Sequence, residues 1–225
     1  MNIIKRLIIK DFIALKSYKR LIITTLVMSI VFTFLGFFDK EMEMVTYVGI
    51  TLPISILGGL ASSIIYEEEK ANSDSYILTF PVTKKDVILG KYLFNVSLII
   101  VGFIIVLITS LICKIFLSLH LLRTLLLMVV FGSATNLLFV LKTPFVYKYG
   151  TEKANSILLI ILFAILSILP VLLISLKSID PEYKNTIDIL SSFIPYIPFI
   201  GVILIILFNY ISYKKSYKIY AKKEF

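Results

Sequence analysis

The chain has 225 residues, of which 59% are hydrophobic, and its 23 Lys and Arg against 14 Asp and Glu give it a net charge of +9. A soluble domain is roughly 45–50% apolar, and its apolar residues are not gathered into long blocks as they are here. A membrane β-barrel would show segments of about ten residues that alternate between polar and apolar, and none is visible. We therefore expect an all-α integral membrane protein.

The first 20 residues predict an amphipathic basic helix. Ile4, Leu7 and Ile8 recur at spacings of three or four residues, while lysines and arginines occupy the other side. Such a helix lies in the membrane interface, with its basic side chains against anionic headgroups. Two interpretations stay open: an anchor that only fixes topology, or an elbow helix that transmits force to the first span.

Six apolar runs of roughly 18–22 residues follow, each long enough to cross a hydrocarbon core about 30 Å thick as a helix. They make residues 1–225 a single transmembrane domain, with the spans inside 21–213 and a basic tail at 214–225. The runs are residues 21–38, 45–66, 92–113, 121–141, 157–176 and 193–213.

The basic residues set the predicted orientation. The N-terminal segment, the loops at 67–91 and 142–156, and the C-terminal tail together carry 18 of the 23 Lys and Arg. Because basic loops stay on the cytoplasmic side, we expect both termini and these two loops in the cytoplasm. Membrane topology explains the positive charge, and no nucleic-acid partner is expected.

The loop at 67–91 is longer than a simple connection requires. It opens with three glutamates, Glu67–Glu69, and then places apolar side chains at 76–80, where water is expected. Pro81 ends any helix that contains them. An apolar patch beside a charged rim is typical of a partner site, although a segment lying on the membrane surface would look the same.

A second helix is expected to leave this loop. Thr83 and Asp86 have the spacing of a capping box, which predicts a helix that begins near Lys84 and continues into the third span. In the loop at 142–156, Pro144 is expected to end the fourth span, and Gly150 allows a turn before Thr151 caps the next helix.

Polar side chains are sparse within the spans. Small and amide residues on the third and fourth spans favour helix packing within one chain, and the alternative is that they line a translocation path. Either role is predicted for Asn95, Thr109, Gly132, Ser133, Thr135 and Asn136.

The sequence lacks the residues that ion-coupled transport, a metal site or a phosphate-binding loop would require. No series of buried carboxylates or histidines supports a proton- or sodium-coupled antiporter, and His120, the one histidine, leaves no zinc ligand set. The Gly90-Lys91 pair lacks the rest of a phosphate-binding loop, so no catalytic, cofactor or metal site is expected in this chain.

Together these features resemble the membrane subunit of a type-2 ATP-binding-cassette exporter. The resemblance is carried by Glu-Glu-Glu-Lys at 67–70, Tyr-Ile-Leu-Thr-Phe-Pro-Val-Thr-Lys-Lys-Asp at 76–86 and Leu-Gly-Lys-Tyr at 89–92, with Phe80 where the family usually has Leu. Pro144, Tyr147, Gly150, Glu152 and Lys153 are similar to a second motif of the family.

The resemblance implies a six-span permease whose loop after the second span forms a coupling helix on a separate cytoplasmic ATPase. That ATPase would bind ATP, and a second permease subunit, identical or different, would complete the transporter. The coupling residues that it implies are Glu67, Glu68, Glu69, Lys70, Tyr76, Leu78, Phe80, Pro81, Thr83, Lys84, Asp86, Gly90 and Lys91.

Within that family the chain is similar to Gram-positive exporters of amphipathic peptides, such as the phenol-soluble modulin exporters. This implies a bacterial plasma membrane and a cytolytic or antimicrobial peptide as the exported substrate. Two other functions remain open, a membrane scaffold or assembly protein without transport and a secondary transporter, and dependence on an ATPase partner separates them from an exporter.

Overall fold

The computed structural model describes residues 3–38, 43–117, 121–163 and 197–223, and these form helices joined by turns, with no strand among them. The all-α class expected from the sequence is confirmed for this part of the chain. The elements are α1 (Ile3–Ala14), the short 3-10 helix η1 (Leu15–Tyr18), α2 (Lys19–Phe38), α3 (Glu43–Lys70), α4 (Ser73–Ile77), α5 (Lys84–Leu117), α6 (Leu121–Tyr149), a helix at 151–163 and α9 (Ile197–Ala221).

Four helical segments of the described chain are long and apolar enough to cross a membrane. They are Ile3–Leu35, Val45–Lys70, Lys84–Ile115 and Thr124–Tyr149, and they contain the first four predicted spans apart from a few terminal residues. Most of the fifth predicted span and the start of the sixth lie outside the described residues. The described residues are those of a multi-pass helical membrane protein, and the total of six spans remains a prediction.

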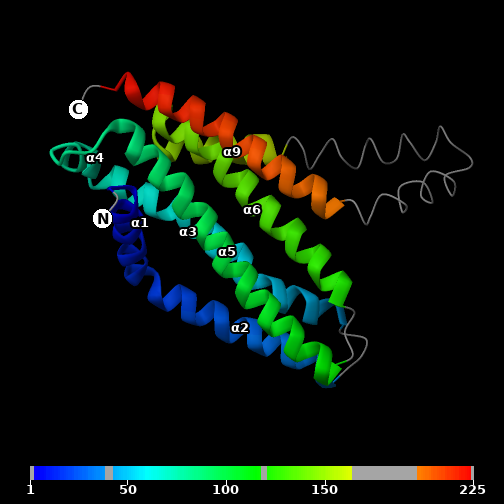
Figure 1. Cartoon of the computed structure of the whole chain (residues 1–225). Coiled ribbons are helices and arrows are strands. Elements are labelled where there is room, and N and C mark those ends of the chain that lie inside the picture. The colour runs from blue at the N-terminus through cyan, green and yellow to red at the C-terminus, as the bar shows by residue number, and fades with distance from the viewer. Residues whose placement is uncertain (1–2, 39–42, 118–120, 164–196, 224–225) are drawn as a thin grey trace, which may run out of the picture.

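The long helices form one elongated bundle (Figure 1). Helix α3 contacts α2, α5 and α6, and α9 packs against α5 and α6 on the side away from α2. Helix α4, the C-terminal end of α6 and the last turn of α9 all lie at one end, which we call the loop end. The larger of the two buried apolar clusters lies toward this end and includes Ile64, Ile88 and Tyr220.

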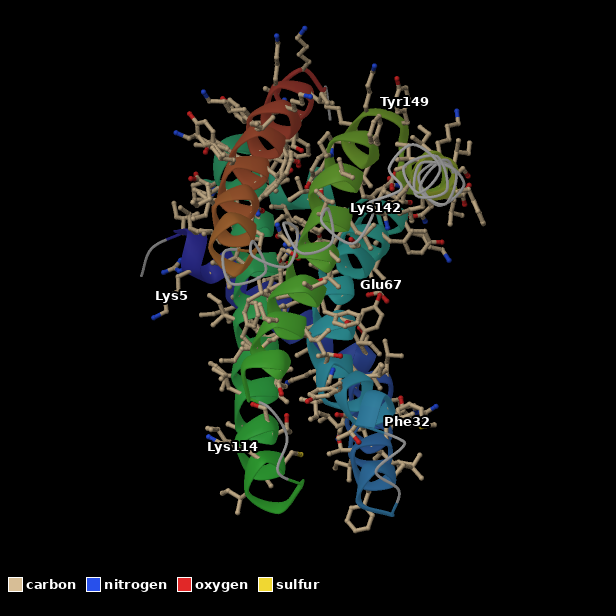
Figure 2. All side chains as sticks on the ribbon, turned by 90° about the vertical axis from the view of Figure 1, so that its right-hand side faces the viewer. Lys5, Phe32, Glu67, Lys114, Lys142 and Tyr149 are labelled. Atoms are coloured by element: carbon tan, nitrogen blue, oxygen red, sulfur yellow. The ribbon has the colours of Figure 1, made fainter. Side chains whose placement is uncertain are left out.

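Basic side chains gather toward the loop end among those drawn in Figure 2, where Tyr149 and Lys142 lie toward one end and Lys114 toward the other. This is the distribution that the positive-inside rule requires if the loop end faces the cytoplasm.

The expectation that Pro144 ends the fourth span is wrong, because α6 continues through it to Tyr149. Proline lacks an N–H, so the carbonyl four residues earlier, that of Val140, loses its partner within the helix. Ser212 of α9 donates its hydroxyl hydrogen to that carbonyl at 2.6 Å. A neighbouring serine thus allows the helix to continue in a setting where water is scarce.

Helix α3 contains the same arrangement. Pro53 lies inside it, and the carbonyl of Gly49, four residues earlier, accepts a 2.6 Å hydrogen bond from the hydroxyl of Ser29 on α2. Gly49 also lies so close to α2 that an added Cβ would be 2.7 Å from Cβ of Phe32. Glycine at this position is therefore required for the two helices to approach.

The break between α4 and α5 agrees with the sequence. Helix α4 ends at Ile77, before Pro81, and α5 begins at Lys84. The Thr83 hydroxyl accepts the Asp86 N–H at 3.2 Å, and an Asp86 carboxylate oxygen accepts the Thr83 N–H at 3.2 Å. The predicted capping box and helix start are thus confirmed.

Candidate functional site

Four charged side chains from three helices meet at the loop end. Lys10 and Asp11 come from α1, Glu68 from the last turns of α3 and Lys91 from the second turn of α5. The Lys91 Nζ lies 2.8 Å from Asp11 Oδ1 and 2.5 Å from Glu68 Oε2. Lys10 pairs with Glu68 and lies 3.2 Å from Asp11 Oδ1. We call these four residues the charged cluster.

The charged cluster is electrically balanced and partly buried. The side chains of Asp11 and Lys91 are 1% and 5% exposed, that of Glu68 is 15% exposed, and that of Lys10 is 40% exposed. Charges removed from water are costly unless opposite charges satisfy them, and removing one partner of such a pair leaves the other uncompensated. The pairing therefore fixes α1 against both helices that flank the loop at 71–83.

Apolar contacts hold α1 against α5 in the same place. A Cβ added to Gly90 would lie 3.3 Å from Cβ of Leu7, so the glycine permits a close approach. The rings of Phe12 and Phe94 pack edge to face, with centroids 5.2 Å apart. Gly90 and Lys91, which the resemblance implies as coupling residues, therefore make their contacts inside this chain.

Glu69 closes the second loop. Its Oε2 accepts the N–H of Thr151 at 2.7 Å, where the helix at 151–163 begins. Gly150 just before it has a φ of +85°, and an added Cβ there would lie 2.8 Å from Glu69 Oε1. The turn at Gly150 agrees with the sequence. The cap, however, comes from the carboxylate of Glu69 and not from the Thr151 side chain as expected. A negative charge is stabilised at the N-terminus of a helix, where the helix dipole is positive.

Lys84 connects the start of α5 to the end of α9. Its ammonium group donates to the carbonyls of Ala221 at 3.2 Å and Lys223 at 2.6 Å. Cations suit the carbonyl-rich ends of helices. Both sides of the loop are thus attached to other elements of the bundle.

The loop itself presents apolar groups to solvent. Tyr76 and Phe80 are 66% and 50% exposed, and their rings pack edge to face with centroids 5.3 Å apart. Ile77 is buried, and Leu78 is half-buried against the apolar core.

A cavity of about 540 Å³ lies between this loop and α1, and Leu7 is among the residues that line it.

The predicted coupling residues thus divide by exposure, and nothing in the described chain tests their contact with a partner. Glu67, Lys70, Tyr76, Phe80, Pro81 and Thr83 are exposed, Glu68, Glu69, Leu78, Lys84 and Asp86 are half-buried, and Gly90 and Lys91 are buried.

Of the polar and small residues predicted on the third and fourth spans, Asn95, Gly132 and Asn136 are buried, and Thr109, Ser133 and Thr135 are half-buried. Asn95 of α5 donates to the side-chain oxygen of Asn136 on α6 at 2.9 Å, and both are buried. A Cβ added to Gly132 would lie 2.9 Å from Cδ1 of Ile54. The hydroxyls of Thr109, Ser133 and Thr135 bond to carbonyls of their own helices. These contacts favour the helix-packing interpretation over a path through the single chain.

A neutral hydroxyl network joins α5 and α9. The Tyr92 hydroxyl lies 2.5 Å from Ser212 Oγ and 2.9 Å from Ser216 Oγ, and all three side chains are buried. Since Ser212 also donates to the Val140 carbonyl, the network reaches α6.

Sequence reasoning missed Asp11 and the role of Lys10. The available signal was that Asp11 is the one acidic residue among the first 38 and lies four residues after Leu7, on the same helical face. An isolated carboxylate on an apolar face should have indicated a buried partner. Within the described residues, no group of three or more His, Cys, Asp and Glu side chains could hold a metal.

Comparison with known proteins agrees with this architecture. A search of curated proteins found no match. The sequence model of the family described as ABC-2 family transporter protein matches residues 6–221, which is nearly the whole chain. The chain therefore belongs to the ABC-2 transporter family.

Proposed function

We propose that this chain is the permease subunit of an exporter and that a separate cytoplasmic ATPase docks at its loop end. The observation that carries the proposal is the exposed aromatic pair Tyr76–Phe80 on a loop whose two sides are fixed to the bundle. Aromatic side chains dominate the energetics of many protein interfaces. Because the charged cluster and Lys84 hold both sides of the loop, a push on the loop would move α1, α3 and α5 together.

The cavity beside the loop supports the same proposal. It lies between α1 and the residues at 76–82, so an apolar side chain of the ATPase entering it would touch α1 and the loop at once. Since the carboxylates of Glu68 and Glu69 are engaged within the chain and Glu67 interacts with the Tyr18 hydroxyl, the ATPase contact would rest mainly on the exposed aromatics and Lys70.

The test replaces only the exposed pair. Tyr76→Ala with Phe80→Ala should leave the chain inserted and folded but reduce co-purification of an ATP-binding-cassette ATPase by tenfold or more, since anchors of this kind cost about 2 kcal/mol or more each. The matched control is Tyr217→Ala, an aromatic on α9 that is 38% exposed. Unchanged ATPase recovery with the double variant would exclude the pair as the docking site.

For the substrate we propose an amphipathic peptide, and for the complete transporter two permease subunits with both termini in the cytoplasm. The substrate proposal rests on the resemblance to Gram-positive peptide exporters. Its test is peptide export from cells that carry wild-type protein or the Tyr76→Ala, Phe80→Ala variant. Export of an amphipathic peptide that is equal in the two strains would contradict it.

A further inference from the structure

A groove between α6 and α9 combines apolar walls with lysine side chains, and the proposed function gives it no role. It encloses about 500 Å³, and its walls include Leu141 and Pro144 of α6 with Phe208 and Ile211 of α9. The two helices lie side by side in both views (Figures 1 and 2). Phe208 and Ile211 are 40% and 48% exposed, so the groove presents an apolar surface at the outside of the bundle.

One end of this groove is basic. Lys148 of α6 and Lys215 and Lys218 of α9 line it, and all three are exposed. Both helices run toward the loop end, and each lysine follows these four apolar wall residues of its helix by four to ten positions. At 1.5 Å per residue, the Cα atoms of the lysines lie about 6–15 Å beyond those of the four wall residues along the helix axes.

The charge in the groove is not compensated by the residues that line it. No Asp or Glu is among them, and the ion pairs of the charged cluster join α1, α3 and α5, not α6 or α9. The Lys148 ammonium lies 4.7 Å from the centroid of the Tyr149 ring, a contact that leaves its charge in place. Three cations around an apolar slot are complementary to an anion that carries a hydrocarbon chain.

We propose that this groove binds one anionic phospholipid. An acyl chain would lie along the apolar walls, and the phosphate would lie among Lys148, Lys215 and Lys218. Basic pockets between transmembrane helices at the cytoplasmic side are known to take anionic headgroups, and each nearby Lys adds about 1 kcal/mol of attraction to an anionic membrane surface. The order of apolar wall and basic end along the helices matches the order of acyl chain and headgroup in a leaflet.

The test compares lipid retention by the purified full-length chain. Native mass spectrometry would follow phosphatidylglycerol and phosphatidylcholine with identical acyl chains, each added at the same concentration. The wild-type chain should retain phosphatidylglycerol at least tenfold better. Lys148→Gln with Lys215→Gln and Lys218→Gln should remove that preference, and salt should weaken it because exposed charges are screened over about 8–10 Å.

The matched control removes the same charge elsewhere. Lys153→Gln, Lys214→Gln and Lys222→Gln replace three exposed lysines that do not line the groove, and phosphatidylglycerol retention should change by less than about twofold. Equal loss in both triple variants would show attraction to net charge alone and overturn the proposal. Equal retention of both lipids by the wild-type chain, or a preference that the groove variant keeps, would also overturn it.

Discussion

At the loop end, the lysines on the two sides of the bundle differ in their burial and in their pairing. In the corner formed by α1, α3 and α5, Lys91 is buried and paired with Asp11 and Glu68. In the corner formed by α6 and α9, Lys215 and Lys218 are exposed, and neutral hydroxyls form the buried contacts. The comparison shows that lysines of similar sequence context differ in their local setting: Lys91 joins helices inside the bundle, while Lys215 and Lys218 are available to the anion proposed above.

The largest effect should follow from opening the charged cluster. Lys91→Met keeps most of the side-chain volume but leaves Asp11 and Glu68 with Lys10 alone, so we expect a loss of about 3–5 kcal/mol in the free energy of unfolding. The measurement is reversible unfolding of the purified chain in mixed micelles. Lys85→Met is the control, since Lys85 is an exposed lysine in the first turn of the same helix and its replacement should cost within about 0.5 kcal/mol.

A double-mutant cycle sharpens this prediction. Asp11→Asn, Lys91→Met and their combination should give a coupling energy above about 1 kcal/mol, because the two groups are in direct contact. Additive effects of the two substitutions would mean that the ion pair does not hold α1 to α5.

The opposite corner should lose less when its neutral network is cut. Ser212→Ala removes the donor to the Val140 carbonyl, and an unsatisfied buried carbonyl costs about 1–3 kcal/mol. The same unfolding assay measures it. Pro144→Ala restores an N–H within α6, so Ser212→Ala should cost clearly less in that background. An equal cost in both backgrounds would show that the serine does not compensate for the proline.

The contrast between the corners also explains what the sequence could and could not predict. Hydropathy runs predicted the four long spanning helices of the described chain, and the Thr83–Asp86 spacing predicted where α5 begins, because both are local signals. Pro144 was misinterpreted as a helix end because the hydroxyl that allows the helix to continue comes from Ser212, 68 positions later. Such long-range donors leave no local pattern.

The candidate site shows the same division. The aromatic pair at Tyr76 and Phe80 could be found from apolar residues in a charged loop, and its exposure agrees with that prediction. The glutamates were assigned together to a partner, yet Glu68 and Glu69 lie on adjacent positions of α3 and reach different elements of this chain. Sequence spacing places side chains on a helix face, but which other helix lies opposite depends on the packing of the bundle.

The smallest effect concerns Glu69 and the second loop. Its carboxylate replaces a capping side chain for the helix at 151–163, and removing a cap costs about 0.5–2 kcal/mol. Glu69→Ala should therefore destabilise the chain by about 1 kcal/mol in the unfolding assay. Glu69→Gln should cost less, because the amide oxygen still accepts the Thr151 N–H and only the charge at the helix N-terminus is lost. Since the contact lies inside the chain, ATPase co-purification should be the same for both variants. If Glu69→Gln instead leaves stability unchanged and weakens ATPase recovery as strongly as the Tyr76→Ala, Phe80→Ala variant does, then Glu69 contacts the partner, and the cap on the second loop is not its main role.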